Sequence, residues 1–351
     1  MIALFALANA GILGAVGSEV PIDLDRSGNW ARVFAADDGW DFFFASGGDY
    51  QWVPLDEDFT PDIGRQRRLT GRTDLIDHAI TRCPDGSWLH IGSRTDARLD
   101  DGAWAFRYDA DMSRVAEAEL YAGEPSQIHR DMPVVCGERF HGTGFFDPDN
   151  FVSFTLVELD DDLGIVRTVE PDEAPIVTGS SLYEDGDTLG IVSFPGGFTD
   201  QLLVREYDID SLELLDLHLQ SVSDATHDAY WSQGHVQVGT RHVVAHMARD
   251  PSEGWQSQDG DVWLSVFSAD WRIEEQVQVT YNTAPIGAMQ PGLTVKDDTL
   301  VVTYTRDLGL YVTPVALIPE EEPPSPGCPR SGWAFVGVLF FPFARRSRRP
   351  S

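Results

Sequence analysis

The chain has 351 residues, 42% of them hydrophobic, and 57 acidic residues against 25 basic ones give it a formal charge of −32. This acidic balance repels the phosphates of nucleic acids and anionic lipid headgroups, so we exclude both as partners of the body of the protein. An aromatic content of 11%, with 32 glycines and 21 prolines, favours strands and tight turns over helices.

The first segment, residues 1–17, is an apolar run that ends in small residues. Such a run is typical of the hydrophobic part of a secretory signal peptide, with cleavage expected near Gly17 or after Ala10. A buried first strand or helix is the alternative, because no polar residues alternate within the run. We assign residues 1–17 to a signal peptide and residues 18–318 to the folded domain.

Within residues 18–318, one pattern with a period of about 50 residues recurs six times. Each copy has a short apolar strand, a polar turn and a second apolar strand, which together predict a β-hairpin. The turns of the first five copies contain Gly39, Gly86, Gly137, Gly186 and Gly239, and the sixth turn contains Asp297 and Asp298 instead.

A second strand pair with an acidic turn follows each of the first five hairpins. We interpret the recurrent acidic residues as turn formers, because aspartate bonds to its own backbone in tight turns; they are Asp58, Asp111, Asp162, Asp210 and Asp270. Two hairpins make a four-stranded sheet that cannot bury both faces alone, and radial stacking of the copies solves this. The sequence therefore predicts an all-β fold, a single six-bladed β-propeller with four-stranded blades.

The sixth copy lacks a fourth strand, because residues 310–317 run directly into a proline-rich segment. Residues 20–24 form a short apolar stretch at the start of the domain. We expect this N-terminal strand to pair with residues 310–317 and close the ring.

The arrangement of hairpins is similar to that of propellers of the five-bladed glycosidase and sialidase kind. The chain lacks the S-x-D-x-G-x-T-W box, the WD dipeptides and the kelch double glycines that mark several propeller families. The resemblance implies a propeller glycoside hydrolase as one function. The absence of the S-x-D-x-G-x-T-W box is evidence against such an enzyme.

The C-terminal part has a different composition. Residues 319–327 form an acidic, proline-rich linker, and residues 328–351 contain Cys328, an apolar stretch and a cluster of arginines. This order resembles the C-terminal sorting tags of myxobacteria and related Gram-negative predators. The resemblance implies export, processing by a sorting protease, and attachment through Cys328 at the cell surface or outer membrane, with release to the medium as an alternative. A simple membrane anchor in this tail would give nearly the same location.

Polar residues gather in the segments that enter the predicted innermost strands, where a propeller binds ligands at its axis. We take Asp77, Asp131 and Asp228 as candidate catalytic carboxylates, and we expect ligand contacts from His78, His129, Arg130, His227, Tyr230, Trp231, Trp255 and Gln290. No H-x-H or H-E-x-x-H spacing accompanies these histidines, so we predict no metal site. Neither a cofactor nor the ligand follows from the sequence. The alternative to ligand binding is that these polar residues line the central opening of the propeller, which we call the throat, and contact only water.

Two functions fit this pattern. The first is a surface-displayed, monomeric, non-catalytic propeller that binds a ligand or surface component such as a glycan. The second is a glycoside hydrolase in which the three aspartates act as acid, base and pKa modulator. Canonical glycosidases need two carboxylates about 5–9.5 Å apart, and no glutamate stands at a predicted throat position, so we favour the binding protein.

Two cysteines lie before the turns of adjacent copies. Cys83 and Cys136 are separated by 136 − 83 = 53 residues, which is one repeat. Equivalent positions of neighbouring blades lie close together near the axis, and export places them in an oxidising compartment. We predict a disulfide between them; two buried free thiols are the alternative.

Overall fold

The structure is a computed structural model that describes most of the chain between residues 11 and 318. The described ranges are 11–24, 28–72, 74–75, 77–94, 101–123, 133–146, 154–169, 177–195, 201–223, 228–249, 260–281, 289–307 and 309–318. Within these ranges, only the backbone is described at residues 101, 121–123, 145–146, 154, 177–179, 195, 228, 230–233, 249 and 289. The chain divides into units 1–318 and 319–351, and the second unit, with Cys328, lies outside the described residues.

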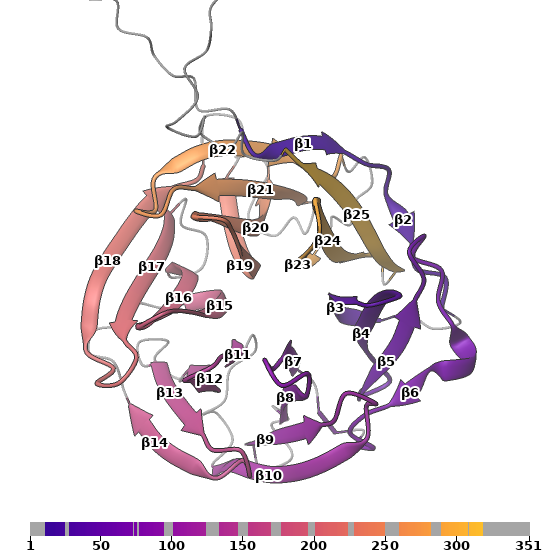
Figure 1. Ribbon diagram of the computed structural model, residues 1–351, viewed down its shortest axis with the longest axis vertical. Helices are drawn as coiled ribbons and strands as arrows, with labels where there is room; N and C mark the ends of the chain where they lie inside the picture. Colours follow the sequence, from indigo (N-terminus) through magenta and orange to yellow (C-terminus); the bar gives the residue numbers. More distant parts are fainter. Residues whose placement is uncertain are drawn as a thin grey trace, which may run out of the picture. The chain divides into compact units, whose positions relative to one another are not determined.

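The first unit is built from sheets whose strands follow one another outward from a central axis (Figure 1). The innermost strands are β3 (Asn29–Ala36), β7 (Asp77–Arg82), β11 (Val134–Cys136), β15 (Val177–Asp185), β19 (Asp228–Val238) and β23 (Met289–Lys296). The second strands are β4 (Gly39–Ser46), β8 (Trp88–Arg94), β12 (His141–Phe146), β16 (Thr188–Pro195), β20 (Arg241–Arg249) and β24 (Thr299–Arg306).

The remaining strands form the outer part of each sheet. The third strands are β5 (Asp49–Leu55), β9 (Asp101–Tyr108), β13 (Phe154–Leu159), β17 (Gln201–Asp208), β21 (Asp261–Phe267) and β25 (Gly309–Leu317). The outermost strands are β6 (Arg67–Arg68), β10 (Arg114–Gly123), β14 (Ile165–Val169), β18 (Leu214–Ser221), β22 (Ile273–Gln278) and the pair β1 (Leu13–Val16) and β2 (Val20–Pro21). Among the described residues, helical structure is limited to the 3₁₀ turn η1 (Ile63–Arg65), and no helix there could span a membrane.

Six antiparallel sheets surround the axis as the blades of a propeller (Figure 1). Blades 1 to 5 contain β3–β6, β7–β10, β11–β14, β15–β18 and β19–β22, and blade 6 contains β23–β25 with β1 and β2. The predicted all-β fold with six four-stranded blades is confirmed.

The hydrophobic core is divided among the six layers between neighbouring blades, which we call seams. Each seam has its own cluster of buried apolar side chains. The 1–2 seam is rich in aromatic residues, such as Tyr50, Trp88 and Phe106, and the 4–5 seam contains Tyr183, Phe267 and Trp271. Stacking of blades therefore buries the sheet faces that a single blade would leave in water.

The turns between first and second strands follow the predicted glycines. Four of the five predicted glycines, Gly39, Gly86, Gly186 and Gly239, have positive φ angles, a conformation that glycine adopts without steric cost, whereas Gly137 does not. In blade 6, Asp297 takes the same left-handed conformation (φ 51°). Aspartate tolerates that region better than most residues, which explains how the last copy manages without a glycine.

The turns between third and fourth strands share a pattern of hydrogen bonds from backbone N–H groups to one side chain. The predicted turn aspartates lie within these turns, but the side chain that accepts the backbone N–H bonds comes two residues earlier. These acceptors are Asp56, Asp109, Asp160 and Asp208, with Ser268 in their place in blade 5. A buried apolar residue with left-handed backbone follows in each turn: Phe59, Met112, Leu163, Leu212 and Trp271. Burial of these side chains offsets the cost of the strained backbone.

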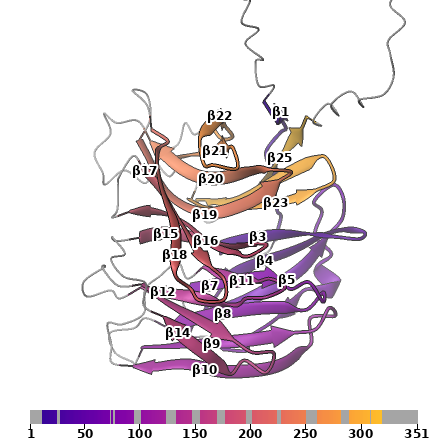
Figure 2. The same ribbon diagram turned by 60° about the vertical axis from the view of Figure 1, so that its left-hand side comes forward.

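The ring is closed by N-terminal residues, as predicted. Val20 and Pro21 of β2 pair with Val312 and Tyr311 of β25. The structure adds β1, whose Leu13 and Val16 also pair with β25. Figure 2 shows β1 lying beside β25.

The strand β1 lies within the segment that the sequence analysis assigned to a signal peptide. Ile12 and Leu13 are buried in the 5–6 seam. For these residues the structure shows the alternative, a buried first strand. Cleavage near Gly17 would remove this strand from the propeller, whereas cleavage after Ala10 would keep it.

A disulfide joins Cys83 in blade 2 to Cys136 in blade 3, with their Cα atoms 4.9 Å apart. Both residues lie in the buried cluster of the 2–3 seam. The predicted link between adjacent blades is therefore present, and it encloses one repeat of the chain.

Candidate functional site

A narrow cavity lies where the six innermost strands meet. Its volume is about 120 Å³. All six blades contribute to its lining, which consists of Arg32, Phe34, Ala79, Ile80, Thr81, Pro133, Val134, Ser180, Ser181, Leu182, Gly234, His235 and Leu293. Pockets that enclose a drug-sized ligand have volumes of roughly 300–1,000 Å³, so this cavity fits one functional group of a ligand rather than a whole sugar unit.

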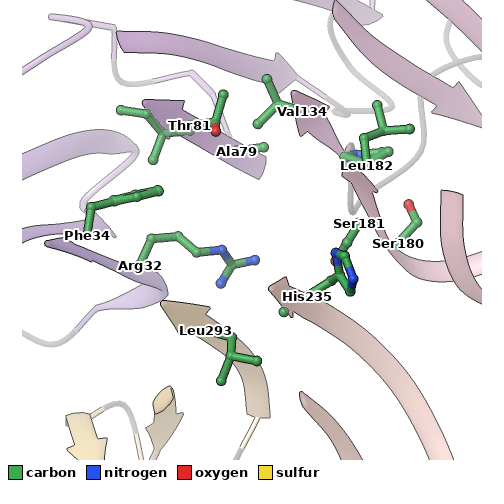
Figure 3. Close-up of a pocket in the computed structure, with 13 residues that line it drawn as sticks. Arg32, Phe34, Ala79, Thr81, Val134, Ser180, Ser181, Leu182, His235 and Leu293 are labelled. Atoms are coloured by element: carbon green, nitrogen blue, oxygen red, sulfur yellow. The ribbon is translucent and has the colours of Figure 1, made fainter. Parts of the chain in front are cut away.

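Arg32 is the one charged side chain among the lining residues just named, and it extends from β3 into the middle of the cavity (Figure 3). Its Nη1 donates to the carbonyl oxygen of Ala31 at 2.8 Å and lies 3.5 Å from that of Gln290. Both acceptors lie on the backbone of the innermost strands. These bonds orient the guanidinium, whose planar set of donors suits a carboxylate or sulfate group.

Two glycines allow the innermost strands to approach each other beside Arg32. A Cβ atom at Gly292 would lie 2.4 Å from Oγ1 of Thr303 and 3.0 Å from Cδ of Arg32. A Cβ atom at Gly234 would lie 2.9 Å from Cβ of Leu293. Larger side chains at these two positions would therefore displace the residues that shape the cavity.

On the opposite side of the cavity, His235 connects the lining to the 4–5 seam. Its Nε2 lies 3.1 Å from Nδ1 of His242. Burial, with a smaller effect of His242, lowers the pKa of His235 to about 3. The imidazole is therefore neutral at physiological pH, and it contributes a hydrogen-bonding group rather than a charge.

The structure places three of the sequence-predicted residues in the interior. Asp77 and His78, on β7, are 1% and 4% exposed. The His78 ring stacks on Tyr50 and on His90 of the same blade, with centroids 4.7 and 5.3 Å away. Gln290 accepts a hydrogen bond from the backbone N–H of Trp30 through its Oε1 at 3.0 Å. In this structure Asp77 and His78 offer almost no surface to a ligand, and Gln290 joins blade 6 to blade 1.

The other candidates cannot be placed in the site. His129, Arg130, Asp131, His227 and Trp255 lie outside the described residues, and only the backbone of Asp228, Tyr230 and Trp231 is described. The predicted convergence of His78, Asp131, His227 and Asp228 stays a prediction for this reason.

Sequence reasoning missed the cavity residues themselves. Arg32 lies in the strand sequence NWARVFAA, where a single arginine among apolar residues in an innermost strand is the signal that could have found it. Ser180 and Ser181 lie in β15 without a motif that marks them. The sequence analysis looked at the loops at the strand ends, whereas the described cavity is formed by the strands.

No protein-family model matches the chain, and no curated protein matches it. Among solved structures, a protein of unknown function from Dyadobacter fermentans has a TM-score of 0.62 at 12% identity, covering 86% of this chain and 98% of that one. Phage phi92 endosialidase has a TM-score of 0.59 at 9% identity, covering 91% of this chain and 71% of that one. A subtype N10 neuraminidase-like protein of A/little yellow-shouldered bat/Guatemala has a TM-score of 0.54 at 10% identity, covering 88% and 99%. Identities this low show the propeller fold alone.

Proposed function

We propose that this protein is a non-catalytic, surface-displayed propeller that binds an acidic group of its ligand at Arg32. The guanidinium of Arg32 in a narrow cavity lined by hydroxyl groups is the observation that supports it. The cavity admits a carboxylate or sulfate, and the rest of the ligand lies outside it. An acidic glycan of the cell surface has this chemistry.

The alternative function is a propeller glycoside hydrolase of the glycosidase or sialidase-like kind. Two of the solved structures with this fold are an endosialidase and a neuraminidase-like protein, and those words describe those proteins. Glycoside hydrolysis usually needs a pair of carboxylates across the scissile bond. The described lining of the cavity contributes none, so the binding function has the better support.

A glycan array tests the two functions together. The purified propeller is applied to sulfated, sialylated, uronic-acid and neutral glycans, and release of free sugar is measured in parallel. We expect binding to acidic glycans without hydrolysis. Binding limited to neutral glycans would contradict the role of Arg32, and turnover that is lost in Asp131→Asn or Asp228→Asn would establish the hydrolase.

Substitution of Arg32 sharpens this test. Arg32→Gln should weaken binding of an acidic glycan about 10- to 100-fold, because a hydrogen bond to a charged group contributes roughly 1.5–3 kcal/mol. Arg82→Gln is the matched control, since Arg82 lies at the exposed end of β7 and donates to the carbonyl oxygen of Ala35. Equal affinity of Arg32→Gln and the native protein would contradict the proposal.

Export and surface attachment complete the proposed function. The Cys83–Cys136 disulfide suits an oxidising compartment, and the packing of β1 favours signal cleavage after Ala10 over cleavage near Gly17. We expect N-terminal sequencing of the exported protein to begin at Gly11. Cys328→Ala should move the protein from the cell surface to the medium; unchanged surface retention would argue for a simple membrane anchor.

A further inference from the structure

A second cluster of polar side chains lies far from the axis, on the outer strands of blade 4. Glu206 on β17 and Asp216 on β18 are directly opposite each other in the antiparallel pairing. His218 is two residues further along β18, on the same face of the strand. One ligand atom from each of the three side chains lies within 4.8 Å of the other two.

The strand register imposes a repulsion in this cluster. The pairs Arg205 with Leu217 and Glu206 with Asp216 set the alignment of β17 and β18 here, next to an irregularity at Tyr207, and they place both carboxylates on the same face of the sheet. Like charges directly opposite each other in a sheet are destabilising. A divalent cation between them would balance both negative charges.

The two carboxylates are already oriented for this task. Oε1 of Glu206 accepts hydrogen bonds from the Tyr183 hydroxyl at 2.9 Å and from Nε1 of Trp271 at 3.0 Å. Oδ1 of Asp216 accepts the backbone N–H of Leu217 at 2.7 Å. The remaining oxygens, Oε2 of Glu206 and Oδ2 of Asp216, face Nε2 of His218 at 3.4 and 3.6 Å. Donors outside the coordination sphere orient metal ligands in this way in known sites.

The distances from His218 to the two carboxylates are compatible with a small tetrahedral ion. Tetrahedral zinc with bonds of about 2.0–2.1 Å places its ligands about 3.3 Å apart, close to the distances from His218 to both carboxylates. One imidazole and two carboxylates also suit zinc and neighbouring transition metals, whereas calcium needs six to eight oxygen ligands. The side chain of Asp216 is 63% exposed, which leaves the ion a route from solvent.

We propose that Glu206, Asp216 and His218 form a binding site for a divalent transition-metal ion of the zinc type, with water as the fourth ligand. The site joins the outer strands of blade 4 and, through Trp271, is tied to blade 5. It is independent of ligand binding at Arg32. The prediction of no metal site rested on sequence spacing among the throat histidines and did not consider these strands.

Zinc titration of the untagged, full-length protein tests this proposal. We expect one tightly bound zinc per chain by calorimetry, an increase in melting temperature with zinc, and no such increase with calcium or magnesium. Cobalt in the same site should give the visible absorption of a tetrahedral complex. Asp216→Asn and His218→Gln should each abolish tight binding, and Tyr183→Phe should weaken it about tenfold or more, as for other supporting residues of metal sites.

The metal-free variants separate a metal site from a simple ion-pair cluster. Without metal, Asp216→Asn should melt at or above the temperature of the native protein, because it removes the repulsion. His141→Gln is the matched control, since His141 lies 3.7 Å from Asp161 without a second carboxylate in that contact, and it should bind zinc normally. Absence of zinc binding at millimolar concentration, or unchanged binding in His218→Gln, would overturn the proposal.

Discussion

Two seams of the propeller each contain a pair of histidines. The two pairs occupy equivalent strand positions but have different surroundings. His78 pairs across the sheet with Gly92, two residues beyond His90, and His235 pairs with Val244, two residues beyond His242. Each pair therefore has the same diagonal relation, and in each pair two ring nitrogens lie 3.1 Å apart. The blades that carry them, 2 and 5, are three positions apart in the ring of six.

The surroundings of the two pairs decide what they do. His78 and His90 stack among Tyr50 and Phe106 and are almost completely buried. In the 4–5 seam, His235 lines the central cavity, while the His242 ring stacks on Trp271, which donates to Glu206. The same local pattern is thus buried packing in the 1–2 seam, whereas in the 4–5 seam one histidine lines the cavity and the other stacks on the tryptophan that contacts Glu206.

The largest expected effect comes from removing a tryptophan from each seam. Trp88 and Trp271 are both almost fully buried, so Trp88→Ala and Trp271→Ala should each lower the free energy of unfolding by about 3–5 kcal/mol. Of these two variants, only Trp271→Ala should also weaken zinc binding, because Trp271 donates to Glu206 and Trp88 does not contact the cluster. Chemical denaturation measures the change in the free energy of unfolding, and zinc titration measures the change in affinity. Equal zinc affinity in both variants would contradict a functional difference between the two seams.

Blade 2 also has a covalent link to blade 3. Reduction of Cys83–Cys136, or the double change to serine, should lower the free energy of unfolding by about 2–4 kcal/mol, because a 53-residue loop is then free in the unfolded chain. Zinc binding by Glu206, Asp216 and His218 on blade 4 should not change. The measurement is denaturation with and without reductant, and a loss of zinc affinity on reduction would show that the seams are coupled.

Acid should destabilise both histidine pairs, and the 1–2 seam more strongly. Burial lowers the pKa of His78 to about 3 and that of His90 well below its usual value. Burial also lowers the pKa of His242, but the carboxylates of Glu206 and Asp185 oppose this effect. Because the folded-state values lie below the unfolded value of about 6.5, the unfolded chain binds more protons, and stability is lost progressively as the pH falls from about 6.5 towards 3.

Single variants measure this difference. For each histidine that stays neutral in the folded protein, the free energy of unfolding is about 2 kcal/mol lower at pH 5 than at neutral pH. His90→Phe should remove about that much of the pH dependence, and His242→Phe should remove less. Denaturation curves at neutral pH and at about pH 5 provide the comparison, and the opposite order would contradict the role assigned to Glu206 and Asp185.

The sequence predicted the arrangement of blades and the disulfide well because both depend on period and spacing. Repeated hairpins with turn glycines determine the strand count, and one repeat between Cys83 and Cys136 places them in adjacent blades. The cluster of Glu206, Asp216 and His218 depends on the register between β17 and β18. An Asp-x-His pattern in a strand shows that two side chains share a face, but it does not show which residue lies opposite.

The interior position of His78 illustrates the same limit. A histidine at the start of an innermost strand has the same sequence signature whether it lines the throat or packs into a seam. Its place is decided by Tyr50, which lies in another blade and 28 residues earlier in the chain. The N-terminal strand β1 is a similar case, because an apolar run predicts burial in a membrane or in a protein core equally well.

The smallest expected effect concerns one hydroxyl group in each seam. Tyr50 stacks on His78 and Tyr183 contacts His235 in a tilted orientation, at nearly the same centroid distances of 4.7 and 4.6 Å. The Tyr50 hydroxyl donates to the carbonyl oxygen of Trp30 at 3.2 Å, whereas that of Tyr183 donates to the carboxylate of Glu206 at 2.9 Å. Tyr50→Phe should therefore cost about 1 kcal/mol, as for an ordinary neutral hydrogen bond.

Tyr183→Phe should cost slightly more without metal, since a hydrogen bond to a carboxylate is stronger than one to a carbonyl group. In the presence of zinc the difference between the two variants should widen, because Glu206 also loses part of its orientation for the ion. The melting temperatures of both variants, measured with and without zinc, give all four values. If the gap between the variants is the same with and without zinc, the Tyr183 hydroxyl only packs the 4–5 seam and does not support a metal site.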